Sequence, residues 1–226
     1  MKEGKLSLVA TPIGNLEDIT LRAIRTLKEC DYVLCEDTRV TGKLLHHYEI
    51  SKKMHRYDAH TSESAHKQIL DDLESGKHIA LVSDAGTPGI SDPGVLLIQN
   101  AREAGVLIEA IPGPSAVTTA VSLAGIAGNQ FSFLGFVPQK KGRETFFKSL
   151  KEYDHPVVFF ESTHRIIKTL ESLEQTFPET AIYIGRELTK MHEEMLVGSA
   201  TEIIRTLSDK PVKQKGEFVI IVDCRS

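Results

Sequence analysis

The most unusual stretch of the sequence is the loop 83–94, which lies between two apolar runs and reads Ser-Asp-Ala-Gly-Thr-Pro-Gly-Ile-Ser-Asp-Pro-Gly. Glycine permits positive φ angles and proline fixes φ, so this composition is typical of a loop with one defined backbone shape. Asp92 and Pro93 are explained as the N-cap and first residue of a helix that Gly105 ends. The part from Asp84 to Ser91 exceeds the roughly two to six residues that such a connection needs. We therefore expect it to bind a ligand at the carboxyl end of a buried strand.

Other polar segments also follow predicted strands, namely residues 11–15, 36–39, 112–115, 161–165 and 186–190. Taken singly, each has a structural explanation, because acidic and hydroxyl residues cap helices and an arginine beside a glutamate forms ion pairs. The carboxyl ends of parallel strands share one edge of a sheet, so their loops can converge. The joint placement of these segments therefore favours a common ligand site.

Several familiar sites are missing from the sequence. It contains no Walker-type phosphate loop, no Gly-x-Gly-x-x-Gly turn and no Gly-x-Ser-x-Gly nucleophile elbow. The nine histidines form no zinc-binding pattern, and Cys30, Cys35 and Cys224 have no metal-ligand spacing. We expect no metal site, and we interpret the three cysteines as small buried residues of a protein in a reducing compartment.

Composition indicates an ordinary globular protein of one large or two modest domains. The chain has 226 residues, 41% of them hydrophobic and 26% charged, with a net charge of -4. A mildly acidic chain is a poor nonspecific nucleic-acid binder, although a local basic patch remains compatible with it. The N-terminal apolar run is too short for a signal peptide, and we expect a cytoplasmic protein.

The segment 110–139 carries no charge, but proline and glycine interrupt it. Its apolar piece, 116–127, is shorter than the roughly 20 residues that span a bilayer. We expect a buried helix there and no association with a membrane.

The elements that position these loops alternate between strand and helix in the first half. Strands are predicted at residues 6–10, 32–35, 54–57, 79–82 and 107–111, and several are apolar without a period of two. That pattern indicates a parallel sheet covered on both faces.

Beyond residue 112 some strands follow one another without a helix. Strands are predicted at 131–136, 156–160, 181–185, 195–197 and 218–222, with helices near 166–173 and 201–207 and a basic loop at 139–143. We therefore predict an N-terminal α/β domain, 1–112, with a mainly parallel sheet, and a C-terminal α/β domain, 113–226, with a mixed sheet.

Seven motifs in order resemble those of the bacterial 16S rRNA (cytidine-2′-O)-methyltransferases, members of the tetrapyrrole-methylase superfamily of S-adenosylmethionine-dependent enzymes. They lie at residues 11–20, 36–39, 83–94, 112–116, 161–165, 186–190 and 215–218 and cover nearly the whole chain. The resemblance implies the two-domain (class III) fold, S-adenosylmethionine in the cleft between the domains, and a homodimer acting on 16S rRNA or the small ribosomal subunit. Many members continue into a helical C-terminal extension, whereas this sequence stops at residue 226, which bears on RNA affinity more than on donor binding.

The resemblance also assigns site residues. The methyl donor pocket is expected at Pro12, Asp84, Gly86, Thr87, Ile90, Ser91, Ser115 and Ala116. The acceptor hydroxyl needs a base or a cation beside it. Glu36, Asp37, Glu161 and Glu187 are candidate bases, and Arg39, Arg165, Arg186 and Lys190 candidate cations. Among them we predict Glu161, Arg186 and Glu187 to be catalytic.

RNA phosphates are expected to contact a set of basic residues: Arg39, Lys140, Lys141, Arg143, Arg165 and Lys168. An ordinary solvated basic surface explains the same residues equally well. Two other functions stay open. One is methylation of a tetrapyrrole or other small molecule, although such enzymes usually show Gly-x-Gly-Pro-Gly-Asp where this chain has residues 11–15. The other is a noncatalytic nucleotide-binding or ribosome-assembly module.

Overall fold

The computed structural model describes residues 3–91 and 94–225. The chain divides into two compact units, Met1–Ser115 and Ala116–Ser226. The division falls three residues after the predicted boundary. Residues 112–115 pack with the first unit, since a Cβ placed on Gly113 would lie only 3.0 Å from the Cβ of Ala10.

The N-terminal unit is built on a five-stranded sheet in the order β3-β2-β4-β1-β5. Every pairing in it is parallel. The strands are β1 (Lys5–Val9), β2 (Tyr32–Cys35), β3 (Lys53–Arg56), β4 (His78–Val82) and β5 (Leu107–Ile111). The predicted parallel sheet is confirmed, and all four residues of β2 and all five of β4 are buried.

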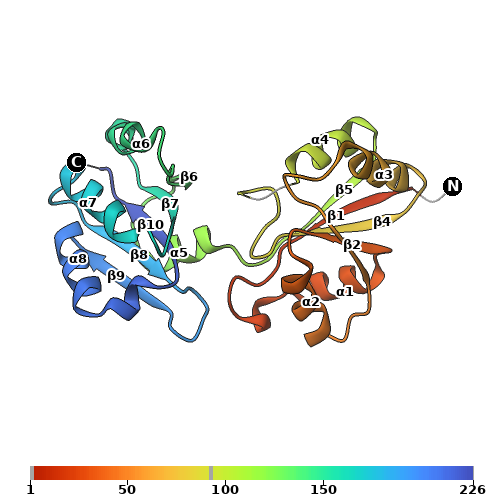
Figure 1. Cartoon of the computed structure of the whole chain (residues 1–226), viewed down its shortest axis with the longest axis horizontal. Helices are drawn as coiled ribbons and strands as arrows, with labels where there is room; N and C mark the ends of the chain where they lie inside the picture. Colours follow the sequence, from red (N-terminus) through yellow and green to blue (C-terminus); the bar gives the residue numbers. More distant parts are fainter. Residues whose placement is uncertain (1–2, 92–93, 226) are drawn as a thin grey trace. The chain divides into compact units, whose positions relative to one another are not determined.

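Helices cover both faces of this sheet (Figure 1), as the unbroken apolar strands predict. On one face, α1 (Leu21–Glu29) and α2 (Thr38–His47) pack against residues such as Val9 and Val33. On the other, α3 (Glu63–Glu74) and α4 (Val95–Glu103) pack against Leu34 and Leu81. A short 3-10 helix, η1 (Leu16–Asp18), precedes α1.

Side-chain caps begin three of these α-helices. The hydroxyls of Thr20 and Ser62 accept from backbone N–H groups of α1 and α3, and the carboxylate of Asp37 does so for α2. Helix α4 begins later than predicted, at Val95, with Gly94 at its N-cap. The predicted cap, Asp92 with Pro93, lies outside the described residues.

The C-terminal unit contains a mixed sheet in the order β6-β7-β10-β8-β9, which confirms the predicted sheet type. Its strands are β6 (Ser132–Phe136), β7 (Val157–Ser162), β8 (Ile182–Arg186), β9 (Glu194–Gly198) and β10 (Glu217–Val222). The pair β6 and β7 is parallel, and the other pairings are antiparallel.

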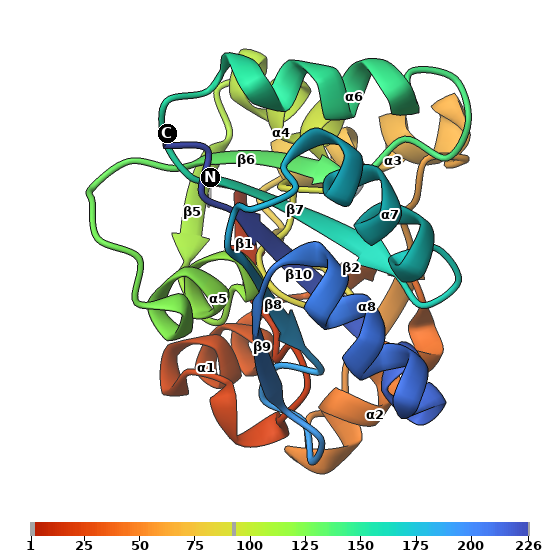
Figure 2. The same cartoon turned by 90° about the vertical axis from the view of Figure 1, so that its left-hand side faces the viewer.

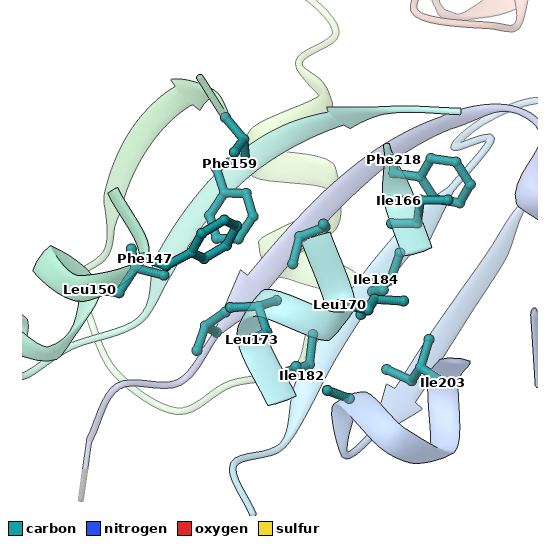
Figure 3. Packing of buried hydrophobic residues seen from close by; sticks show 14 of the residues in the cluster. Phe147, Leu150, Phe159, Ile166, Leu170, Leu173, Ile182, Ile184, Ile203 and Phe218 are labelled. Atoms are coloured by element: carbon teal, nitrogen blue, oxygen red, sulfur yellow. The ribbon is translucent and has the colours of Figure 1, made fainter. Parts of the chain in front are cut away.

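One face of this sheet carries the main core of the unit, beneath α6 (Arg143–Ser149), α7 (Ile166–Thr176) and α8 (Ala200–Asp209) (Figure 2). Alternate residues of the strands meet these helices, and Phe159 lies beside Phe147 of α6 while Ile166 and Leu170 of α7 lie over the sheet (Figure 3). Two 3-10 helices, η2 (Leu150–Glu152) and η3 (Pro211–Gln214), complete the unit.

Two local predictions for this unit are wrong. Arg143 begins helix α6 instead of ending a basic loop. Its side chain is buried, whereas a residue of a basic loop would be exposed. Helix α5 (Ala116–Ala124) is only partly buried: Val117 and Ala120 are covered, whereas Leu123 is 47% exposed. The helix therefore packs through one face, against β8 and β10.

Candidate functional site

The loops after β1 and β4 are joined by a pair of backbone hydrogen bonds. The N–H of Thr11 donates to the carbonyl of Gly86 at 2.9 Å, and the N–H of Gly86 donates to the carbonyl of Thr11 at 3.0 Å. The buried hydroxyl of Thr11 also donates to the carbonyl of Ser83 at 2.9 Å. Two of the segments predicted to converge therefore meet at the carboxyl edge of the parallel sheet.

Gly86 adopts a backbone conformation that side chains disfavour. Its φ is +84°, and a Cβ there would lie 3.5 Å from Ile13 Cγ2 and 3.7 Å from the carbonyl oxygen of Pro114. The loop after β5 is thus also adjacent. Gly89 has a φ of +78°, so the loop turns twice in the region that glycine favours.

The loop after β2 joins the same edge through Asp84. The backbone N–H of Asp37 donates to Oδ1 of Asp84 at 3.1 Å. The neighbouring strands β2 and β4 are followed by connections that run in opposite directions. The chain goes from β2 to β3 at one edge of the sheet and from β4 to β5 at the other edge. Such a divergence is where open parallel sheets bind ligands.

The residues predicted to bind the methyl donor in the N-terminal unit are all on these loops. Pro12, Asp84, Thr87 and Ser115 are half-buried, Gly86 is buried, and Ile90 and Ser91 are exposed. The remaining one, Ala116, is the first residue of α5 in the other unit. Their role as donor ligands stays a prediction.

Asp37, which is half-buried, and Arg39, which is exposed, form an ion pair at the start of α2. The guanidinium donates to both carboxylate oxygens, with Nη2 2.6 Å from Oδ2. These hydrogen bonds, together with the one from the backbone N–H of Arg39, hold the pKa of Asp37 well below its usual range. A carboxylate so stabilised in its charged form is a weak base, while Arg39 remains exposed.

Glu161 lies at the end of β7 with a fully buried carboxylate. Oε1 accepts from the N–H of Ser162 at 2.6 Å and lies 2.8 Å from Nη2 of Arg165. Oε2 accepts from the hydroxyl of Thr169 at 2.6 Å. Both oxygens are occupied by groups of the same unit, so the geometry favours a positioning role. The predicted catalytic role remains untested.

Arg143 departs from the exposed basic surface predicted for it. Its side chain is 9% exposed, and its Nη1 lies 3.5 Å from Oε2 of Glu161. Nη2 donates to the hydroxyl of Thr169 at 2.8 Å, and the guanidinium lies over the ring of Phe147. Its Nε and Nη1 have no hydrogen-bond partner among the described residues. By contrast, Lys140, Lys141 and Lys168 are exposed.

Arg186 ends β8 and is also buried. Its guanidinium donates to the carbonyls of Lys213 at 2.9 Å, Lys215 at 3.0 Å and His192 at 3.2 Å. It thereby ties the β8–β9 turn to the segment before β10. Arg186 therefore holds the backbone of these loops in place. Its predicted catalytic role stays a prediction.

The turn after Arg186 contains two residues in the left-handed region, Glu187 with φ +50° and Thr189 with φ +65°. Glu187 Oε1 accepts from Lys190 Nζ and from the N–H of Glu217, both at 2.9 Å. Burial alone would raise the pKa of Glu187, but these hydrogen bonds outweigh it and lower the pKa. Glu187 therefore stays charged while it fixes this turn.

Two hydroxyls with central roles were not among the predicted site residues. The sequence indicates Thr11 only as part of the loop 11–15. Thr169 lies within a helix, and nothing in the sequence distinguishes it from other helical threonines. In the described part of the chain, no three histidine, cysteine, aspartate or glutamate residues are grouped as a metal site would need. None of the described helices is long and apolar enough to cross a membrane.

Comparison with known proteins gives relatives that match nearly the whole of this chain. Ribosomal RNA small subunit methyltransferase I of Thermotoga maritima is 43% identical, over 97% of this chain and 98% of the relative. The protein of the same name from Halalkalibacterium halodurans is 45% identical, over 98% of this chain and 76% of the relative. That of Escherichia coli O157:H7 is 40% identical, over 98% and 78%.

Solved structures share the fold at low identity. A cobalt precorrin-4 methyltransferase of cobalamin biosynthesis has a TM-score of 0.73 at 17% identity and covers 98% of this chain and 96% of its own. A diphthine synthase has a TM-score of 0.73 at 18% identity and covers 97% and 89%. The family model of the tetrapyrrole (corrin/porphyrin) methylases matches residues 5–204. With a match of this extent and the strand-end loops that meet at Thr11 and Gly86, the chain belongs to the tetrapyrrole methylase family.

Proposed function

We propose that this protein transfers a methyl group from S-adenosylmethionine to the ribose 2′-hydroxyl of a cytidine in 16S rRNA. The observation that carries the proposal is the name shared by relatives that match nearly the whole of this chain, ribosomal RNA small subunit methyltransferase I. The nucleoside and the oxygen come from the motif resemblance. The geometry of the N-terminal unit supports the donor part of the reaction.

The loops around Gly86 fit such a donor. S-adenosylmethionine, when bound, supplies a methyl group on a sulfonium sulfur. In an in-line displacement an oxygen nucleophile bonds to the methyl carbon and the sulfur is the leaving group. Gly86 has a positive φ and no side chain where three loops meet, and its paired hydrogen bonds with Thr11 fix the shape of the loop that carries Asp84 and Thr87. Asp84 contributes the carboxylate for a cationic or hydroxyl part of the donor. In-line displacement requires mainly that the reactants be held in near-attack geometry.

The contacts in the C-terminal unit support positioning more than proton transfer. Glu161, Arg186 and Glu187 direct their polar atoms at neighbouring groups of the protein. We propose that they shape the loops that follow β7 and β8, so that substitution affects the reaction through the position of those loops. The hydroxyl proton then leaves to solvent or to another carboxylate, for which Glu36 at the end of β2 is a candidate.

RNA phosphates are proposed to contact the exposed cations Arg39, Lys140, Lys141 and Lys168, with the half-buried Arg165 beside them. Arg143 belongs instead to the interior, where it supports the start of α6. Each phosphate contact releases counterions, so activity on RNA should fall as salt rises.

The test is methylation of small ribosomal subunits prepared from cells that lack the modification. Labelled S-adenosylmethionine, the protein and the subunits are incubated, and the labelled nucleotide is mapped by nuclease digestion and mass spectrometry. We expect label on a single cytidine 2′-oxygen, and Asp84→Ala should abolish it. Label on an added tetrapyrrole but not on RNA would support the small-molecule alternative. Binding of the subunit without label would support the noncatalytic one.

A homodimer and a cytoplasmic location complete the proposal. The homodimer follows from the resemblance, and the cytoplasmic location follows from a ribosomal substrate. Light scattering on the purified chain should give twice its 25.0 kDa mass. A mass of a single chain at micromolar concentration would contradict the dimer.

A further inference from the structure

A pocket of about 460 Å³ opens in the N-terminal unit beside the end of β3 and the first turns of α3 and α4. Its volume falls within the range of about 300–1,000 Å³ typical of small-molecule sites. All of its lining residues belong to this unit, and none of them is among the predicted donor residues. Of the family motifs only the end of 83–94 reaches it, through Gly94, and the predicted donor residues leave it without a role.

A hydrogen-bonded network holds one wall of the pocket. Both ring nitrogens of His66 are bonded, Nδ1 to the hydroxyl of Tyr57 at 3.0 Å and Nε2 to the side-chain amide of Asn100 at 2.9 Å. Tyr57 is 4% exposed, and burial raises its pKa. The network links the end of β3 to α3 and α4, so the wall is built from three elements before any ligand binds.

The formal charges on the lining disfavour phosphate. Its formal charges, among the described residues, are the carboxylates of Asp58 and Glu63, and no lysine or arginine lines it. Asp58 is already paired with Nε of Arg56 at 2.7 Å, whereas Glu63 is exposed. A ligand with hydrogen-bond donors and no negative charge fits this lining.

The apolar part of the lining fits a flat ring. Val95 and Leu96 line the pocket at the start of α4 and are 48% and 59% exposed, so their apolar surface is available to a ligand. Cytosine and adenine meet both requirements. Each has a flat ring that can lie against these side chains and an exocyclic amino group that can reach a carboxylate. Carboxylates are the usual acceptors for the N4 amine of cytosine.

The pocket begins close to the predicted donor loop along the chain. Ser91 is the last predicted donor residue and Gly94 already lines the pocket, so their Cα atoms are at most about 11 Å apart. A base held in the pocket would therefore keep its own ribose within reach of that loop. Enzymes that act on a base take it out of the stack, and the same movement would bring the ribose of that nucleotide to the donor loop.

We propose that this pocket receives an amine-bearing nucleobase swung out of the RNA, and so positions the ribose that is methylated. The inference rests on the proposed function for its RNA substrate. Glu63 accepts from the exocyclic amine, and Leu96 contacts the ring. The network of Tyr57, His66 and Asn100 keeps the pocket open.

The first experiment fills the pocket with Leu96→Trp and compares it with Leu107→Trp, a matched change at a leucine 55% exposed at the start of β5. Steady-state methylation of small subunits should show a KM raised about tenfold or more for Leu96→Trp alone. The affinity for S-adenosylmethionine, measured by calorimetry, should be unchanged in both variants. Equal KM values for the two variants, with the wild-type protein active, would overturn the pocket assignment.

The second experiment uses the nucleosides cytidine and uridine as probes, in saturation-transfer NMR on the full chain. Cytidine should give the stronger signal, and Leu96→Trp and Glu63→Gln should each reduce it. Equal signals from the two nucleosides, or a cytidine signal that both variants retain, would overturn the assignment. Absence of subunit methylation by the wild-type protein, with cytidine binding intact, would instead contradict the proposed function.

Discussion

Thr169 donates a 2.6 Å hydrogen bond to the carboxylate of Glu161 and accepts one of 2.8 Å from Arg143. The hydroxyl thus connects a strand end, the middle of α7 and the start of α6. Glu161 carries one negative charge against the two guanidinium groups of Arg143 and Arg165. The carboxylate therefore compensates the buried charge of Arg143 and part of the charge of the half-buried Arg165.

Glu161→Gln should destabilise the protein by about 3 kcal/mol, because it leaves the buried Arg143 and the half-buried Arg165 without a counter-charge. Urea unfolding followed by circular dichroism measures the loss. Glu171→Gln, at an exposed position of α7 in the same unit, should leave the free energy of unfolding unchanged. A large loss of methylation rate in Glu161→Gln with full stability would instead support the catalytic role predicted for Glu161.

The sequence predicts the strands and the meeting of their loops well, because these depend on local patterns. Apolar runs mark β2 and β4, and glycine and proline mark the loop that contains Gly86. Helix α6 escapes prediction, since its seven residues show no apolar period and its N-cap, Gly142, has a φ of +87°. The burial of Arg143 depends on Glu161, eighteen residues away, which no local pattern indicates.

A comparison of Gly86→Ala with Gly105→Ala separates the conformational cost of alanine at a positive φ from an effect on ligand binding. Gly86 and Gly105 both have positive φ, +84° and +73°, so alanine at either should cost about 1 kcal/mol of stability. The site around Gly105 is open, with nothing within 4 Å of an added Cβ. Calorimetry should show weakened binding of S-adenosylmethionine in Gly86→Ala alone. The same affinity in both variants would argue against a donor site at this loop.

Glu187→Gln should show a stability difference from wild type that depends on pH. The hydrogen bonds from Lys190 and the Glu217 N–H lower the pKa of Glu187 below its value in the unfolded chain, despite burial. Its contribution is therefore complete above the unfolded-state pKa of about 4.3 and is lost as pH falls through the folded-state value. Urea unfolding should give a difference between the two proteins that shrinks from about pH 5 to pH 3. A difference that is constant over this range would show that the charge of Glu187 contributes nothing.

Lys140→Ala and Lys141→Ala should weaken binding to small-subunit RNA and reduce its salt dependence. Each lost phosphate contact lowers the slope of log affinity against log salt by about 0.7 to 0.9. Lys28→Ala, at an exposed lysine of α1, should leave the slope unchanged. Arg143→Ala should lower stability instead, since its side chain is buried against Glu161. Filter binding from about 50 to 200 mM salt measures the slopes, and equal slopes for all three lysine variants would contradict the basic RNA-binding surface.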